Sequence, residues 1–131
     1  KKLRDDLNVR NKVLFIGSVD NQVKIAAFRD ADLFIHTVLY MGGVGLSPLE
    51  AILCNCPAVV TPECGEIVIQ SNSGYIVQYG DVKKLTMIMQ NILNNPPDYS
   101  MINRGIEYIH NNLTWTKYID EIETLYRSLG R

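Results

Sequence analysis

The residues from position 42 to position 51 have the types and spacing of an anion-binding loop. The segment is Gly42-Gly-Val-Gly-Leu-Ser-Pro-Leu-Glu50-Ala51, and apolar runs at 33–37 and 58–61 flank it. This order predicts a strand, a glycine loop, a helix and a second strand. Glycines directly after a strand let the backbone turn sharply and approach a ligand closely. The N–H groups at the start of the helix would favour an anion such as a phosphate.

Ser47 and Glu50 also fit a capping box, with Ser47 as the N-cap and Glu50 as the third helical residue. Pro48 would then be the first helical residue, where its missing N–H does no harm. Glu50 is therefore a helix-capping residue, a ligand-binding residue or both, since the third helical position lies beside the same anion site. The loop matches neither the G-x-x-x-x-G-K-[ST] phosphate loop nor the G-x-G-x-x-G dinucleotide fingerprint.

Length and composition limit the class of protein. The chain has 131 residues, which fits one domain, and it is 47% hydrophobic and 21% charged, as expected for a globular protein. Its net charge is −1 and its basic residues are scattered, which argues against a nucleic-acid partner. No apolar run approaches the roughly 20 residues of a membrane span, and no signal peptide is visible. We therefore expect a cytoplasmic protein.

The three cysteines, Cys54, Cys56 and Cys64, have an odd count and no framework spacing, which argues against a disulfide scaffold. A metal site would need a fourth ligand, and His36 is the nearest other candidate. We favour packing of small buried side chains over metal binding, and we expect no metal and no cofactor.

Apolar runs and turn residues predict the remaining elements. Strands are expected at 13–17, 33–37, 58–61 and 74–77, and the run at 66–70 fits either a strand or a short helix. Asp20 would cap a helix over 21–29 with Val23, Ala26 and Ala27 on its inner face, and the helix of the glycine segment would cover 47–55.

The C-terminal part of the sequence is predicted to be helical. Asp81 would cap a helix that ends at Pro96-Pro97, and two further helices follow. Apolar residues three and four positions apart indicate core-facing sides for all three helices. These residues are Val82, Leu85, Ile88, Ile92, Leu93, Ile102, Ile106, Ile109, Leu113, Trp115, Tyr118, Ile119, Ile122, Leu125 and Leu129.

Alternating strands and helices predict an α/β fold with a parallel sheet. Right-handed crossovers would bring the carboxyl ends of the strands to one edge, where such folds bind ligands. The glycine loop would lie at this edge.

Several motifs occur in a characteristic order. They are Val13-x-Phe-x-Gly17, Leu33-Phe-Ile35, the glycine segment, Pro57-Ala-Val-Val-Thr61, Gly65-Glu-Ile-Val68 and Gly74-Tyr-Ile-Val77-x-x-Gly80-Asp81, with Trp115 near the last helix. This set resembles the C-terminal, nucleotide-sugar-binding domain of the retaining glycosyltransferases of family 4 (group 1), which have the GT-B fold. The resemblance implies a Rossmann-like parallel sheet with flanking helices, incomplete here, with 1–131 as one partial domain.

The resemblance also implies roles for individual residues. Glu50 matches a glutamate that accepts hydrogen bonds from the donor ribose, and Glu66 matches a glutamate after a Gly-Gly turn. The implied donor-binding set is Gly42, Gly43, Val44, Gly45, Leu46, Glu50, Gly65 and Glu66. The donor substrate would be a nucleotide-diphosphate sugar, and an N-terminal acceptor domain would complete the protein. Peripheral membrane association through the full-length protein and a homodimer are left open.

The chain departs from the family pattern at three points. The position of the family's first glutamate, which holds the donor sugar, falls on Gly42 or Met41. The Gly-Gly turn is shortened to Gly65. The Gly-Arg…Lys-Gly segment that neutralises the diphosphate has no counterpart and would precede residue 1, as would two strands and the acceptor domain.

Three hypotheses follow for function. The first is an enzyme, a glycosyltransferase that transfers a hexose with retention and is inactive as this chain alone. The second is a non-catalytic nucleotide- or sugar-binding module, and the third is an inactive fragment of a larger transferase. His36 is the candidate catalytic residue because it ends a strand beside the predicted site, and a hydrogen-bonded histidine without catalytic function is the alternative.

The family's strand order, 3-2-1-4-5-6, makes a prediction about residues 13–17. They would correspond to strand 3 and residues 33–37 to strand 4, with strands 1 and 2 absent between them. Apolar strand edges without partners are costly, so we expect residues 13–17 to pack against residues 33–37 or against a second copy.

Overall fold

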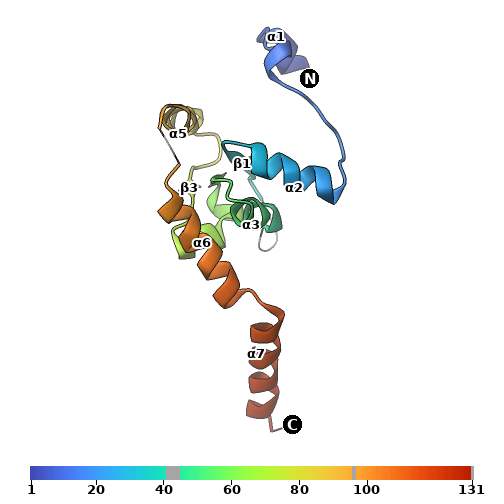
Figure 1. Ribbon diagram of the computed structural model, residues 1–131, viewed down its shortest axis with the longest axis vertical. Helices are drawn as coiled ribbons and strands as arrows, with labels where there is room; N and C mark the ends of the chain where they lie inside the picture. The colour runs from blue at the N-terminus through green and yellow to red at the C-terminus, as the bar shows by residue number, and fades with distance from the viewer. Residues whose placement is uncertain (41–44, 96, 131) are drawn as a thin grey trace.

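The computed structural model describes residues 1–40, 45–95 and 97–130 of the chain. Three short parallel strands form a central sheet, and helices surround it (Figure 1). The elements in chain order are α1 (Lys2–Asp6), a 3-10 turn (Arg10–Lys12), α2 (Asn21–Asp30), β1 (Phe34–His36), α3 (Leu46–Leu53), β2 (Ala58–Val60), a second 3-10 turn (Pro62–Cys64), α4 (Glu66–Ser71), β3 (Tyr75–Ile76), α5 (Val82–Asn94), α6 (Tyr99–Asn112) and α7 (Trp115–Ser128).

The sheet has the order β1-β2-β3, with both pairs parallel. This arrangement confirms the predicted α/β fold and the predicted strands at 33–37, 58–61 and 74–77. The register places His36 beside Val60 and Val60 beside Ile76, so the carboxyl ends of the three strands are level. All three residues of β2 are fully buried, as expected for a central strand without polar alternation.

The main core lies between one face of the sheet and helices α3, α4 and α6. Its buried members are Leu49, Ile52, Ala58, Val60, Cys64, Ile67, Val68 and Ile109. Ile102 and Ile109 of α6 are buried as predicted, whereas Leu113 lies beyond the end of the helix and is exposed. The ambiguous run at 66–70 is helical, because it forms most of α4 and packs Ile67 and Val68 into this core.

Helix α2 packs beside α3, where its Phe28 forms a second buried cluster with Ala51 and Cys56. Asp20 caps it as predicted, accepting a hydrogen bond from the Val23 N–H at 2.9 Å. The predicted inner face of Val23, Ala26 and Ala27 is wrong, because all three are exposed. Phe28 is the buried residue instead, and its ring meets the Phe34 ring edge to face at 5.1 Å.

Helix α5 lies on the opposite side of β1. Asp81 caps it as predicted, through the Lys84 N–H at 2.9 Å. A cavity of about 180 Å³ separates the helix from the strand and is lined by Asp32, Leu33, Ile35, Met89, Ile92 and Leu93. Ile92 is buried, but Val82 and Leu93 are both 71% exposed, so the predicted core face of α5 is only partly covered.

Residues 13–17 do not form a strand, which contradicts the prediction that they pack against residues 33–37. They run extended between the first 3-10 turn and α2, and Leu14 is 83% exposed. A strand needs a partner edge, and the described part of the chain provides none here. The guanidinium of Arg4 lies over the Phe15 ring instead, 5.4 Å from its centroid. Pairing with a second copy stays untested.

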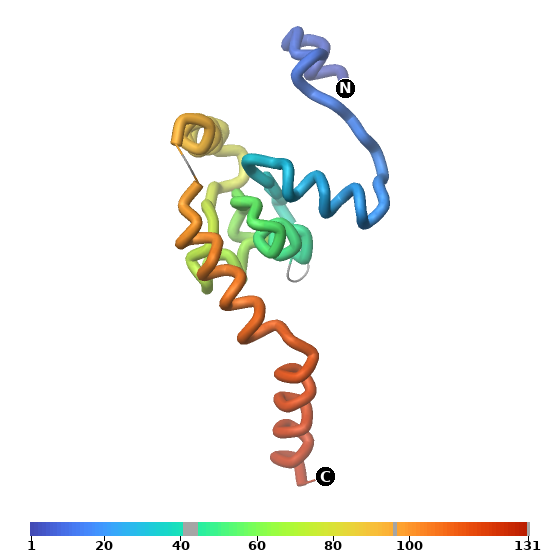
Figure 2. Tube along the Cα trace, viewed as in Figure 1, coloured from blue at the N-terminus to red at the C-terminus, as the bar shows by residue number. Residues whose placement is uncertain are grey.

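Helix α7 extends away from the sheet at the opposite end of the molecule from α1 (Figure 2). None of its residues is buried, and Trp115 is 79% exposed. The predicted core-facing side of this helix is therefore wrong for the described chain. The 3.6-residue period correctly identifies an apolar stripe, but a period does not show that another element covers it.

Gly105 in α6 packs closely against Ser73 and Ile52. A β-carbon at this position would lie 2.6 Å from Ser73 Cβ and 2.8 Å from Ile52 Cγ2. We therefore expect Gly105→Ala to lower the free energy of unfolding by about 1–3 kcal/mol through overpacking. This is opposite to the gain of about 1 kcal/mol that helix propensity alone gives.

Denaturant unfolding measures this change. Asn111→Ala, at an exposed position of the same helix, is the matched control and should be close to neutral. A Gly105→Ala variant as stable as the parent would show that α6 does not pack this tightly.

Candidate functional site

The candidate site is the edge of the sheet where the three strands end. Thr61, directly after β2, joins this edge to the segment that follows β1. Its hydroxyl donates to the Val38 carbonyl at 2.8 Å and accepts from the Val38 N–H at 3.1 Å. Because Thr61 is fully buried, this pair of hydrogen bonds fixes the path of the chain after β1.

Cys64 provides a second connection at the same edge. Its thiol donates to the His36 carbonyl at 3.2 Å. Its own carbonyl lies against Gly45, where a β-carbon would approach it to 3.1 Å. A glycine at position 45 therefore lets the start of α3 lie directly on the segment after β2.

Helix α3 begins at Leu46, one residue before the predicted range of 47–55, and its N-cap lies two residues before the predicted cap Ser47. Gly45 is its N-cap, with β-region φ and ψ of −70° and 109°, and no side chain caps the helix. Ser47 is thus the second helical residue and Glu50 the fifth, so the predicted capping box is wrong. The first N–H groups of a helix have no acceptor within the helix. In α3 these groups belong to Gly45, Leu46 and Ser47, because Pro48 has no backbone N–H.

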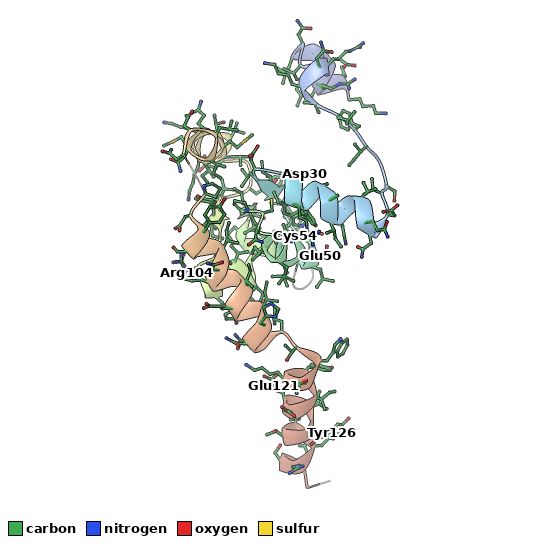
Figure 3. The ribbon with its side chains drawn as sticks, viewed as in Figure 1. Asp30, Glu50, Cys54, Arg104, Glu121 and Tyr126 are labelled. Carbon is green, nitrogen blue, oxygen red and sulfur yellow. The ribbon has the colours of Figure 1, made fainter. Side chains whose placement is uncertain are left out.

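Glu50 pairs with a lysine of a neighbouring helix. Lys24 Nζ in α2 donates to Glu50 Oε1 at 2.7 Å. The Lys24 and Glu50 side chains are 34% and 40% exposed, so solvent screens the pair and it contributes about 1 kcal/mol or less to folding. Figure 3 shows Glu50 on α3, with α2 beside it. Glu50 is therefore accessible to a ligand.

Gly65 and Glu66 lie beside this helix start, because Gly65 directly follows Cys64. A β-carbon on Gly65 would lie 2.5 Å from Val60 Cγ2, so the turn into α4 requires glycine at this position. Glu66 is the first residue of α4, is exposed, and accepts a hydrogen bond from Gln70 at 3.2 Å. The structure therefore places Gly45, at the start of α3, against Cys64, the residue before Gly65, while Leu46 and Glu50 lie on α3 and Glu66 begins α4.

His36 ends β1 at the same edge. Its ring stacks on Phe34 with 5.9 Å between the centroids. Its Nε2 is buried and has no hydrogen-bond partner among the described residues. The alternative prediction, a histidine held by hydrogen bonds, therefore does not hold for Nε2. The remaining predicted site residues, Gly42, Gly43 and Val44, lie outside the described residues.

A cavity of about 260 Å³ opens beside the edge, where β1 and β3 end. Its lining consists of Thr37, Val77, Gln78, Tyr79, Gly80, Asp81, Val82 and Leu85. The cavity borders the candidate site but contains none of the predicted donor-binding residues.

The cysteines pack and donate hydrogen bonds. Cys56 and Cys64 are buried, and Cys56 donates to the Ala31 carbonyl at 3.5 Å. Burial raises the pKa of the Cys56 thiol to about 11, so it stays protonated at neutral pH. The described residues contain no group of three or more His, Cys, Asp and Glu side chains placed to hold a metal ion.

The family model described as glycosyl transferases group 1 matches residues 1–108. The chain therefore belongs to the group 1 glycosyltransferases.

Two curated relatives match nearly the whole chain. An uncharacterised glycosyltransferase of Methanocaldococcus jannaschii is 27% identical over 124 residues, which are 92% of this chain and 32% of the relative. The N-acetyl-alpha-D-glucosaminyl L-malate synthase of Bacillus anthracis is 26% identical over 133 residues, covering 99% of this chain and 34% of the relative. The chain thus spans about a third of the length of these relatives.

A solved structure shares the fold. The sucrose-phosphate synthase of Thermosynechococcus elongatus superposes with a TM-score of 0.81 at 24% identity, over 98% of this chain and 33% of that one. Among residues 1–40, 45–95 and 97–130, no helix is long and apolar enough to cross a membrane.

Sequence reasoning did not identify Thr61 and Lys24 as parts of this edge. Thr61 could have been found, since a polar residue that ends a wholly apolar strand is a candidate for fixing the neighbouring loop. No local sequence pattern indicates the contact of Lys24 with Glu50, because the two residues lie 26 positions apart on different helices.

Thr61→Val keeps the shape of the side chain and removes both hydrogen bonds to Val38. We expect the free energy of unfolding to fall by about 1–3 kcal/mol, since the polar backbone groups of Val38 lose their partner. Thr61→Ser keeps the hydroxyl and should lose clearly less. Thermal or denaturant unfolding compares the two variants, and equal losses would show that the methyl group matters and the hydroxyl does not.

Proposed function

We propose that this chain is the donor-binding part of a glycosyltransferase that transfers a hexosyl group, with retention, from a nucleotide-diphosphate sugar to an acceptor. The observation that supports the proposal is the start of α3. It opens at the carboxyl edge of the parallel sheet, where folds of this type bind ligands, with Glu50 close behind it.

The diphosphate would bind at the N–H groups of Gly45, Leu46 and Ser47. These groups have no acceptor within the helix, and they carry the positive end of its dipole. During transfer the departing diphosphate takes up negative charge, and fixed dipoles near that charge stabilise the transition state without rearranging. Of these three residues, Leu46 is 70% exposed, Ser47 is half-buried and Gly45 is buried.

Glu50 would accept hydrogen bonds from the ribose hydroxyls. The resemblance to the family assigns this role to it, and its accessibility supports the assignment. Gly65 and Glu66 would complete the donor site, since they directly follow Cys64, whose carbonyl lies against Gly45. We assign no chemical step to His36, because its Nε2 is closed to solvent.

The acceptor would bind elsewhere in the natural protein. The relatives are about three times as long as this chain, and the resemblance places the acceptor site in an N-terminal domain. The identity of the hexose and of the nucleotide base would depend on contacts outside the described site.

Replacement of Glu50 tests the ribose assignment. We expect Glu50→Gln and Glu50→Ala to weaken the binding of a nucleoside diphosphate to the natural protein about tenfold, the loss of one charge-assisted contact. Because Glu50 caps no helix, the two variants should keep the stability of the parent to within about 1 kcal/mol.

Calorimetric titration with UDP, GDP and ADP measures the affinities. Glu107→Gln, at an exposed position of α6, is the control for loss of one negative charge. Parent-like affinity in both Glu50 variants would remove Glu50 from the site, and absence of nucleotide binding by the parent would contradict the proposed function.

A further inference from the structure

We propose that Lys24 is a positioning residue for Glu50, holding its carboxylate ready for the ribose of the nucleotide; this inference rests on the proposed function. Lys24 Nζ donates to Glu50 Oε1 at 2.7 Å, a short charge-assisted hydrogen bond. The two residues come from helices α2 and α3, which pack side by side.

Both ends of the ion pair are attached to a fixed backbone. Lys24 directly follows the residue whose N–H binds the Asp20 cap, and its own N–H donates to the Asp20 carbonyl at 3.0 Å. Phe28, one turn further along α2, packs against Ala51, the neighbour of Glu50. The ammonium is therefore presented to Glu50 from a defined direction, and the carboxylate is ordered before a ligand arrives.

Ordering of this kind favours binding. A glutamate side chain that rotates freely loses conformational entropy when it binds a ligand, and a side chain that is already held loses less. The second carboxylate oxygen, Oε2, stays available to a ribose hydroxyl, and Oε1 retains a further lone pair. The vicinal diol of a ribose offers two O–H donors, which matches the two carboxylate oxygens of Glu50.

Lys24 also changes the charge of the site. The start of α3 would hold a diphosphate, and an isolated carboxylate nearby would repel it. The ammonium offsets the charge of Glu50 through their short contact. The pair thus presents a hydrogen-bond acceptor to the ribose without adding a net negative charge beside the phosphates.

The exposure of the pair makes its binding role separable from a folding role. Ion pairs with a third or more of each side chain exposed contribute little to stability. Removal of the lysine should therefore leave the protein folded, which a thermal unfolding curve checks directly.

The experiment compares ribonucleotides with their 2′,3′-dideoxy forms on the full natural protein. Of UDP, GDP and ADP, the tightest ligand of the parent is used with its dideoxy analogue. Lys24→Met should weaken the ribonucleotide about tenfold and the dideoxy analogue about twofold or less. Lys24→Arg, which keeps the charge and a donor, should recover part of the loss. Arg29→Met, in the last turn of the same helix, is the control and should bind as the parent does.

A double-mutant cycle completes the test. In a Glu50→Gln background, Lys24→Met should have no further effect on ribonucleotide binding. Equal losses for the ribo and dideoxy forms, or additive losses in the cycle, would show that Lys24 does not act through Glu50 and would overturn the inference. Parent-like binding by Lys24→Met, together with weakened binding by Glu50→Gln, would overturn the inference alone. A parent that binds no nucleotide would overturn both the inference and the proposed function.

Discussion

The buried central strand β2 is the constraint on which the rest of the structure depends. Ala58, Val59 and Val60 are inaccessible to solvent, and their backbone groups are satisfied by parallel pairing with β1 on one side and β3 on the other. An unpaired polar backbone group in this position would cost as much as a lost hydrogen bond. The strand therefore fixes the register of both neighbours and brings all three carboxyl ends to one level.

The candidate site is a consequence of that register. Thr61 continues β2 and binds both backbone groups of Val38, so the chain leaving β1 is tied to the chain leaving β2. Gly65 then allows a turn where a β-carbon would collide with Val60, and Gly45 lets the start of α3 lie closely on the Cys64 carbonyl. The result is a helix start whose first N–H groups have no acceptor within the helix, about one turn before the part-exposed carboxylate of Glu50.

The sequence predicted features that depend on neighbouring residues and missed features that depend on distant ones. The three strands and the caps at Asp20 and Asp81 follow from local patterns, and they were correct. The capping box at Ser47 failed because the helix starts earlier, with Gly45 as its N-cap against the Cys64 carbonyl. The ion pair between Lys24 and Glu50 joins two helices, and no local sequence pattern indicates it.

Apolar patterns predicted too much burial at both ends of the chain. Residues 13–17 are apolar enough for a strand and α7 has the period of a core helix, yet both lie exposed on the described chain. Periodicity identifies the face that a segment would bury, whereas the partner that buries it comes from elsewhere in the fold.

A structure of the natural protein with a bound nucleoside diphosphate tests the central claim most directly. The account predicts phosphate oxygens within hydrogen-bond distance of the backbone N–H groups of Gly45 and Leu46, and the ribose hydroxyls on Glu50. A nucleotide bound away from the start of α3, for example in the cavity of about 460 Å³ that Trp115 and Tyr118 line, would contradict it.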